Sequence, residues 1–358
     1  MENACGARAG GRRGGRRATF AVPPSALVPR LRYASELGLL AVVLVWGVNF
    51  AVIKVPLEVA PPFTVNLLRF VVSVVVLGAF HARDARRRGV APWAAFAVGP
   101  WRVVGLGLLG ILVYQVGFIL GIARVSSGMG ALLIATSPAW TAVTAHVLRL
   151  ERLLTLGWVG FGVSLAGVAL VVAGNPNHGF GGQASGVALM LAASLAWGLY
   201  TTLSRPLLSR GASPLGLTFW GIVVSFPGLF ALAAPELGSV DWGRFDAAVV
   251  WALLFSGGLS TGLAYAIWNA SVLKVGSSRT AAVSNLVPFI GVVAGVVLQG
   301  DRVTALQVVG GALIVAGVVV VRRRGIGPVE AATAPAPPAP DVPPVSTPPA
   351  GVASGAVR

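Results

Sequence analysis

Polar side chains inside long apolar runs are the residues of this sequence most able to bind a solute. Asn49 lies in the middle of the apolar stretch "WGVNFAVIK", and Lys54 ends it, where we expect it to pair with Glu58. Arg69 lies inside the next apolar run, on the same helical face as Asn66. Charges inside a membrane are costly and usually face protein, water or a partner. Arg69 could therefore bind an anion, but a structural or gating role with Asn66 is favoured.

Two prolines lie in the middle of apolar runs, at Pro138 and Pro288. Each removes one backbone hydrogen bond and crowds the carbonyl four residues earlier, which is that of Ile134 for the first proline. Polar neighbours such as Ser137 and Asn285 could bond to the freed groups or to a ligand. The pattern leaves two interpretations open, a simple kink and the wall of a cavity.

Amphipathic side chains recur at membrane depth. Such residues often form belts at the membrane surface, but some of these lie deeper in their runs. Together with Asn49, Ser137 and Asn285 they are the predicted substrate-binding residues, and they would suit a small amphipathic or aromatic solute. They are Trp46, Tyr114, Gln115, Trp197, Tyr200, Tyr265, Trp268 and Asn269.

The composition requires that these residues be positioned by membrane-spanning helices. Of the 358 residues, 56% are hydrophobic and 11% charged, with a mean hydropathy of +0.82, whereas soluble domains are about 25% charged. A helical span needs about 20 apolar residues, and continuous runs favour helices over a barrel. Ten spans are predicted, at residues 36–53, 63–80, 102–122, 128–148, 156–173, 186–203, 214–233, 248–270, 278–298 and 304–321.

The net charge of +16 reflects membrane topology rather than nucleic-acid binding. With the N-terminus in the cytoplasm, 22 Lys and Arg residues fall on the cytoplasmic side and four on the outer side. This bias places both termini in the cytoplasm. The only cysteine, Cys5, lies in the basic tail at 1–33, and a Pro/Ala-rich tail occupies 324–358; both tails are predicted to be disordered.

An internal repeat relates the two halves of the chain. Residues 125–171 and 275–321 align without gaps, and 15 of the 47 positions are identical. Trp46 also corresponds to Trp197 at a shift of 151. The predicted units are 34–174 and 186–323, joined by an outer loop at 175–185. Because each unit holds five spans, the second enters the membrane from the opposite side, which gives a 5+5 inverted repeat typical of secondary transporters.

These motifs resemble the EamA-like family of the drug/metabolite transporter superfamily. The resemblance rests on "WGVNFAVIK", "LLRFVVS", "SSGMGALLIATSPAWTA", "SSRTAAVSNLVPFIGV" and "GDRVTALQVVGGALIVAGVVVV", in this order over about residues 36–323. It implies a ten-helix carrier of small metabolites or toxic compounds, often directed outward. It also implies a central cavity lined by spans 1, 3, 4, 6, 8 and 9, but no particular substrate.

The predicted function is therefore a carrier in a bacterial cytoplasmic membrane, and by resemblance an exporter. A channel and a membrane-embedded lipid-modifying enzyme are the alternatives, although the sequence shows neither a filter-like loop nor a cluster of catalytic groups. No carboxylate lies at mid-membrane, which disfavours proton-coupled export of cations. The expected partners are a small solute and the lipid bilayer, without nucleic acid, cofactor or metal, and the chain is expected to be a monomer or a homodimer.

Overall fold

The computed structural model describes residues 28–174, 180–275 and 285–327, and all its long elements are helices. The tails lie almost entirely outside these ranges, and residues 180–185 of the predicted outer loop already belong to a helix. The long helices and the short helices joined to them are α1 (Val28–Val52), α2 (Lys54–Leu57), α3 (Pro62–Arg88), α4 (Pro100–Gly107), α5 (Tyr114–Ile122), α6 (Ser127–Ile134), α7 (Ser137–Val147), α8 (Thr155–Ala173), α9 (Phe180–Ser209), α10 (Pro214–Leu237), α11 (Ala247–Leu253), α12 (Ala264–Val275), α14 (Val287–Gln299) and α15 (Ala305–Arg324).

Shorter elements complete the described part of the chain. They are the 3₁₀ turns η1 (Ala94–Val98) and η3 (Trp242–Arg244), the π-helical segments η2 (Leu108–Val113) and η4 (Leu254–Leu263), and the strands β1 (Arg152–Leu153) and β2 (Ile326–Gly327), which pair antiparallel. Helix starts follow from local sequence. Pro62, Pro100 and Pro214 occupy first-turn positions, where a missing N–H costs nothing. Thr304 and Gln307 form a capping box that begins α15.

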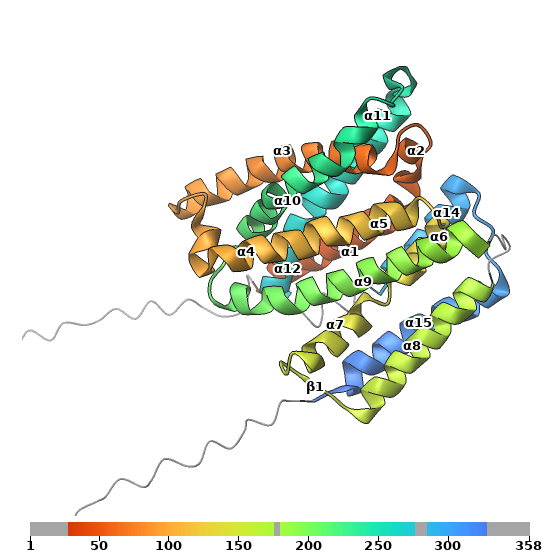
Figure 1. The fold of residues 1–358 in the computed structure, drawn as a ribbon. Coiled ribbons are helices and arrows are strands. Elements are labelled where there is room, and N and C mark those ends of the chain that lie inside the picture. The colour runs from red at the N-terminus through yellow and green to blue at the C-terminus, as the bar shows by residue number, and fades with distance from the viewer. Residues whose placement is uncertain (1–27, 175–179, 276–284, 328–358) are drawn as a thin grey trace, which may run out of the picture.

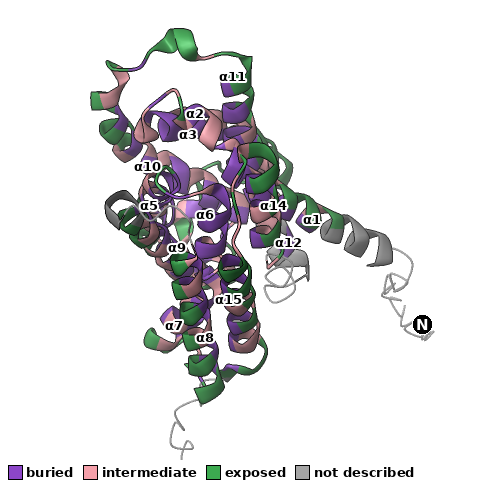
Figure 2. Ribbon diagram, turned by 90° about the vertical axis from the view of Figure 1, so that its right-hand side faces the viewer, coloured by how far each residue is buried: buried purple, intermediate pink, exposed green. Residues whose placement is uncertain are grey.

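Within the described residues, eight of the ten predicted spans are present as helices long and apolar enough to cross a membrane. Large apolar side chains such as Val159, Trp251 and Val308 are exposed on them, as lipid contact requires, and Figure 2 shows exposed residues on the outer faces of α8 and α15. The protein is an all-helical, multi-pass membrane protein. The eight helices are Leu37–Leu57, Pro62–Arg88, Pro100–Ile122, Thr155–Ala173, Ala184–Ser209, Pro214–Leu237, Ala247–Trp268 and Ala305–Arg324.

The two remaining predicted spans are the proline-centred segments. Residues 128–148 form two helices, α6 and α7, interrupted at Ala135 and Thr136. Within 278–298 the structure describes only the 13-residue helix α14 and the turn before it. The interruption has the cause expected from sequence, because Pro138 cannot donate to the carbonyl of Ile134.

Helix contacts in the bundle occur in matched sets. The first helix, α1, packs against α14 and α12, while α9 packs against α6, α7 and α5. The helices α3 and α10 pack against each other, as do α8 and α15, which lie side by side (Figure 1). A shift of 150 residues converts the contacts of α1 into those of α9. The same shift exchanges the two members of the α3–α10 and α8–α15 pairs.

The α8–α15 pair is held at very short range by glycines. A Cβ atom added to Gly167 would lie 2.5 Å from the carbonyl oxygen of Gly310, and one on Gly310 would lie 2.6 Å from that of Gly167. Gly160 and Gly317 meet in the same reciprocal way. Small residues of this kind allow helix backbones to touch inside a membrane.

Two spans contain wide π-helical turns at equivalent positions. Shifting η2 by 150 residues gives 258–263, which lies inside η4. Tyr114 is the first residue of the regular helix that follows η2, and Tyr265 is the second residue of the helix that follows η4. Such turns are rare and often occur at functional sites.

Candidate solute-binding cavity

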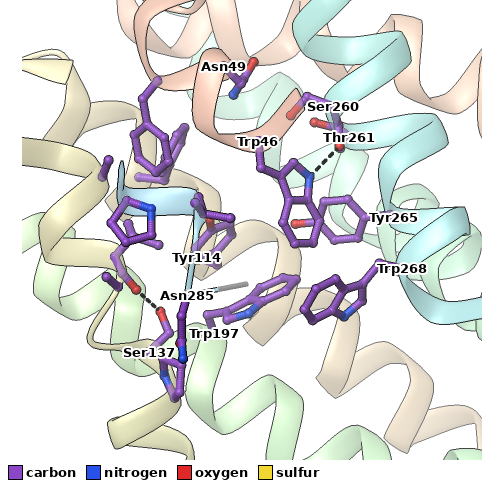
Figure 3. Close-up of a pocket in the computed structure, with 18 of the residues that line it drawn as sticks. Trp46, Asn49, Tyr114, Ser137, Trp197, Ser260, Thr261, Tyr265, Trp268 and Asn285 are labelled. Carbon is purple, nitrogen blue, oxygen red and sulfur yellow. Dashed lines mark hydrogen bonds between the residues drawn. The ribbon is translucent and has the colours of Figure 1, made fainter. Parts of the chain in front are cut away.

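A cavity of about 140 Å³ lies in the middle of the bundle, enclosed by helices from both halves of the chain. Its volume is many times the ~10–15 Å³ that holds one water molecule. The residues around it come from far apart in the sequence, as Figure 3 shows for Asn49, Ser137 and Tyr265. Most of the wall is aromatic or aliphatic, with a few polar groups, which is the usual make-up of a ligand site.

A continuous chain of aromatic rings forms one wall. Trp268 and Trp46 have ring centroids 5.0 Å apart, Trp46 and Tyr265 5.6 Å, Tyr265 and Trp197 5.5 Å, and Trp197 and Tyr114 5.1 Å. Figure 3 shows Trp46, Trp197 and Trp268 gathered in this wall. A shift of 151 residues turns the Trp46–Tyr265 pair into Trp197–Tyr114. Each half thus contributes one tryptophan and one tyrosine to two equivalent contacts.

The opposite wall contains the broken span. Ser137 Oγ donates to the carbonyl of Ile134 at 2.6 Å, the group that Pro138 leaves without its helical partner. Ser194 Oγ on α9 lies 2.9 Å from Ser137 Oγ and 2.8 Å from Thr136 Oγ1, so hydroxyl groups stabilise the break. The carbonyl predicted to be freed by the second proline, that of Ser284, lies outside the described residues.

Arg69 reaches the cavity from α3 and is 2% exposed. Its Nη1 donates to Asn66 Oδ1 and its Nη2 to Thr261 Oγ1, both at 3.3 Å. Its guanidinium carbon lies 5.9 Å from the ring centroid of Phe118. The side chain is therefore fixed by neutral groups from three spans.

Two amide oxygens at the cavity also stand out. Asn49 Oδ1 and Gln115 Oε1 are buried, and neither has a hydrogen-bond partner among the described residues. Both residues line the cavity, on α1 and α5. A buried acceptor without a donor costs about 1–3 kcal/mol, so a ligand that donates to these oxygens would gain that amount.

Most of the predicted site residues lie around this one cavity. Two of the predicted substrate-binding residues are exceptions. Tyr200 packs behind Trp197 at 5.3 Å and bonds to Thr218, and the side chain of Asn269 on α12 lies outside the described residues. The predicted residues that line the cavity are Trp46, Asn49, Arg69, Tyr114, Gln115, Ser137, Pro138, Trp197, Tyr265, Trp268, Asn285 and Pro288.

Several lining residues were not predicted from the sequence. Ser260 accepts a hydrogen bond from Trp46 Nε1 at its carbonyl, at 3.0 Å, and Thr261 bonds to Arg69. The hydroxyl pair in "GGLSTGLAY" was the available sign, since two adjacent hydroxyls are unusual at mid-span. Span 2 and span 10 also reach the cavity, although the resemblance implied neither. The unpredicted residues are Phe50, Phe118, Ala131, Ile134, Ala135, Ser260, Thr261, Val287, Val315 and Val318.

Charged residues gather at two related places away from the cavity. Arg205 Nη1 donates to Glu151 Oε1 at 2.5 Å. The equivalent residues are Lys54 and Asp301, which line a polar hollow of about 300 Å³. There Lys54 Nζ donates to the carbonyl of Val125 at 2.6 Å, rather than forming the ion pair expected with Glu58, and Asp301 Oδ2 accepts from the N–H of Gly128 at 2.9 Å.

The fold and the cavity together define a class of protein, a multi-pass helical membrane protein built around a central ligand-sized space. The sequence pattern of the EamA-like transporter family matches residues 34–173 and again residues 184–323. The chain belongs to this family, which confirms the resemblance seen in its motifs, and it is a membrane transporter.

Individual relatives match over most of their length. An "uncharacterized transporter" of Archaeoglobus fulgidus is 26% identical over 280 residues, which cover 78% of this chain and 95% of that protein. A "probable amino-acid metabolite efflux pump" of Salmonella typhimurium is 27% identical, covering 78% and 91%. A "probable terminal-alkyne amino-acid exporter" of Streptantibioticus cattleyicolor is 28% identical, covering 81% and 93%. Among the solved structures with this fold is a crystal structure with a TM-score of 0.57 and 21% identity, which covers 80% of this chain and 96% of the other.

Proposed function

We propose that this protein is a secondary carrier that works by alternating access, with ten spans in two inverted five-helix units. The observation that carries the proposal is the position of the cavity, which is enclosed by both halves and walled by the equivalent pairs Trp46–Tyr265 and Trp197–Tyr114. In transporters with inverted repeats the substrate site lies at mid-membrane, where the repeats meet. The units 34–174 and 186–323 rock about this site and expose it to each side in turn.

The matched helix contacts support the inverted arrangement. The reciprocal meeting of Gly160 with Gly317 and of Gly167 with Gly310 is what a two-fold axis between α8 and α15 produces. The π-helical turns at equivalent positions of spans 3 and 8 fit the same axis. The broken α6–α7 segment counts as span 4, and α14 with the residues before it counts as span 9.

The solute is a small amphipathic metabolite, and transport is directed outward across a bacterial cytoplasmic membrane. The aromatic wall, with polar groups at a few places, supports an amphipathic solute. Relatives named as an amino-acid metabolite efflux pump and as an amino-acid exporter support the outward direction. The excess of basic residues on one side supports cytoplasmic termini.

Reconstitution into liposomes tests the carrier. With radiolabelled amino acids, other metabolites and lipophilic cations, we expect saturable flux of at least one compound and acceleration of that flux by unlabelled solute on the opposite side. Steady ion currents without saturable flux would favour the channel alternative. Chemical change of a lipid substrate without flux would favour a membrane enzyme.

The two charged clusters predict how the ends of the carrier close. Glu151 and Arg205 form an ion pair, whereas their equivalents Asp301 and Lys54 are each bonded to backbone groups. In an alternating-access carrier one end of the solute pathway is closed while the other is open, so the contacts at the two ends are expected to differ. Glu151→Arg or Arg205→Glu is expected to change the flux rate up to about fivefold, since partly exposed ion pairs contribute about 0.2–1 kcal/mol. The double reversal is expected to restore it.

A second ion pair provides the control for this exchange. Asp84 and Arg88 also bond, at 2.9 Å, but they lie one turn apart on α3 and join no other helix. Reversing both, or either one, is expected to leave flux unchanged. If the Asp84 and Arg88 variants affect flux as strongly as the Glu151 and Arg205 variants, the pair between α9 and the loop before α8 has no special role in closure.

A further inference from the structure

The cavity has one charged side chain among the described residues that line it, that of Arg69. Desolvating a cation costs several kcal/mol unless an anion compensates for it. No described carboxylate lies within 4 Å of this guanidinium, and the described ion pairs are those of Arg88 and Arg205. The groups that do contact it, Asn66 and Thr261, are neutral.

The hydrogen-bonding capacity of Arg69 is also only partly used. Arginine carries five N–H donors, and the two bonds at 3.3 Å occupy one donor on each terminal nitrogen. Nε is buried and has no partner among the described residues. Asn66 and Thr261 hold the planar group in place, which leaves a fixed, electropositive fork at the cavity. A carboxylate matches such a fork in charge and in its two parallel acceptor oxygens.

Two other polar groups of the cavity have the opposite requirement. Asn49 Oδ1 and Gln115 Oε1 are acceptors that lack donors in the described structure. An ammonium or other N–H group on the same solute would supply those donors. The aromatic chain from Trp268 to Tyr114 offers apolar surface to a side chain.

We propose that Arg69 binds the carboxylate of the transported solute, and that this solute is a small zwitterionic amino carboxylate with an apolar or aromatic side chain. The inference rests on the proposed carrier function and names the substrate class of the same cavity. Its basis is the uncompensated guanidinium held by Asn66 and Thr261, together with the two orphaned amide oxygens. Lipophilic cations are excluded by the same charge, because no described carboxylate lines the cavity to balance them.

The test compares one solute with analogues that lack one charge. Purified full-length protein is reconstituted, and flux and binding are measured for L-phenylalanine, for phenethylamine, which lacks the carboxylate, and for phenylalaninamide, which has a neutral amide there. Binding is followed separately by quenching of tryptophan fluorescence. We expect L-phenylalanine to bind at least about 30-fold more tightly than phenethylamine, the factor for a lost charge-assisted hydrogen bond.

Arg69→Gln gives the decisive second comparison. It is expected to remove the preference for the carboxylate, so that L-phenylalanine and phenylalaninamide bind within about twofold of each other. Arg69→Lys, which keeps the charge but not the fork, should retain part of the preference. The matched control is Arg88→Gln on the same helix, which changes an exposed arginine and should leave all three affinities as in the wild type.

The outcomes separate this inference from the carrier proposal. Equal wild-type binding of L-phenylalanine and phenethylamine overturns the carboxylate site, whether or not the protein transports other solutes. So does an Arg69→Gln protein that weakens all three compounds by the same factor, since a purely structural arginine would act in that way. Carboxylate-selective binding without flux supports the site and contradicts the carrier. If Arg69→Gln does not fold, the wild-type comparison and Arg69→Lys decide.

Discussion

Gly167→Val is expected to destabilise the protein by about 3 kcal/mol or more, the upper part of the range for forcing extra carbon into a packed interior. The added Cβ would lie 2.5 Å from the carbonyl oxygen of Gly310 and 2.7 Å from the backbone nitrogen of Ile314. Backbone atoms cannot rotate away as a side chain can, so α8 and α15 must separate. Gly310→Val should have a similar effect, because its Cβ would meet the carbonyl of Gly167.

The same helix provides the control. Gly162 on α8 is exposed, and a Cβ added to it would have no neighbouring atom within 4 Å, so Gly162→Val should be tolerated with little change. The measurement is the midpoint of thermal unfolding in detergent, which is monitored by size-exclusion chromatography of a fluorescent fusion. Equal midpoints for Gly162→Val and Gly167→Val would show that the close α8–α15 contact does not stabilise the fold.

Trp197→Ala is expected to lower kcat/KM for transport by about tenfold to 100-fold. Its ring contacts Tyr114, Tyr200 and Tyr265 at 5.1–5.5 Å, and aromatic pairs contribute about 0.5–1.5 kcal/mol each beyond the area they bury. Removing the indole leaves the two cavity tyrosines without their shared neighbour. Trp197→Phe keeps a ring and should retain most of the activity.

Trp251→Ala is the matched control for this substitution. Trp251 is 70% exposed on α11, so its loss removes an indole without opening the cavity. Both variants are compared by initial rates in liposomes at equal protein density. Wild-type transport rates for Trp197→Ala would show that the aromatic wall is not part of the solute pathway. Equal losses of rate for both variants would indicate a general effect of losing a tryptophan.

The spans could be predicted because hydrophobicity acts over a whole helix. Apolar runs bounded by charges or prolines, such as 214–233 and 304–321, match α10 and α15 to within a few residues. The proline-centred span at 128–148 is an exception. Pro138 was expected to disturb its helix, but the sequence could not show that the helix would end at Ile134 and begin again at Ser137, because this depends on the hydroxyl of Ser194 on another span.

The cavity was predictable where the two repeats agree. The repeat pairs Trp46 with Trp197, and both line the cavity. Phe118 could not be predicted, because phenylalanine is common in spans and its direction is set by how the helices rotate against each other. Lys54 also has a different partner from the one that its sequence neighbours predict. Glu58 lies four residues away along the chain, but the carbonyl of Val125 is closer in the folded structure.

The π-helical turns of spans 3 and 8 have a consequence for tolerance to length changes. A π turn holds more residues than an α turn, so each of these spans behaves as a helix that carries surplus residues. Deleting one residue from η2 or η4 would let the local backbone relax toward a regular helix, while Tyr114 or Tyr265, in the segment that follows, would stay close to its present direction. In most helices the deletion of a single residue disrupts the helix and its packing. Here the deletion would remove only the surplus, and the two tyrosines that contact the tryptophans in the aromatic wall would keep their positions.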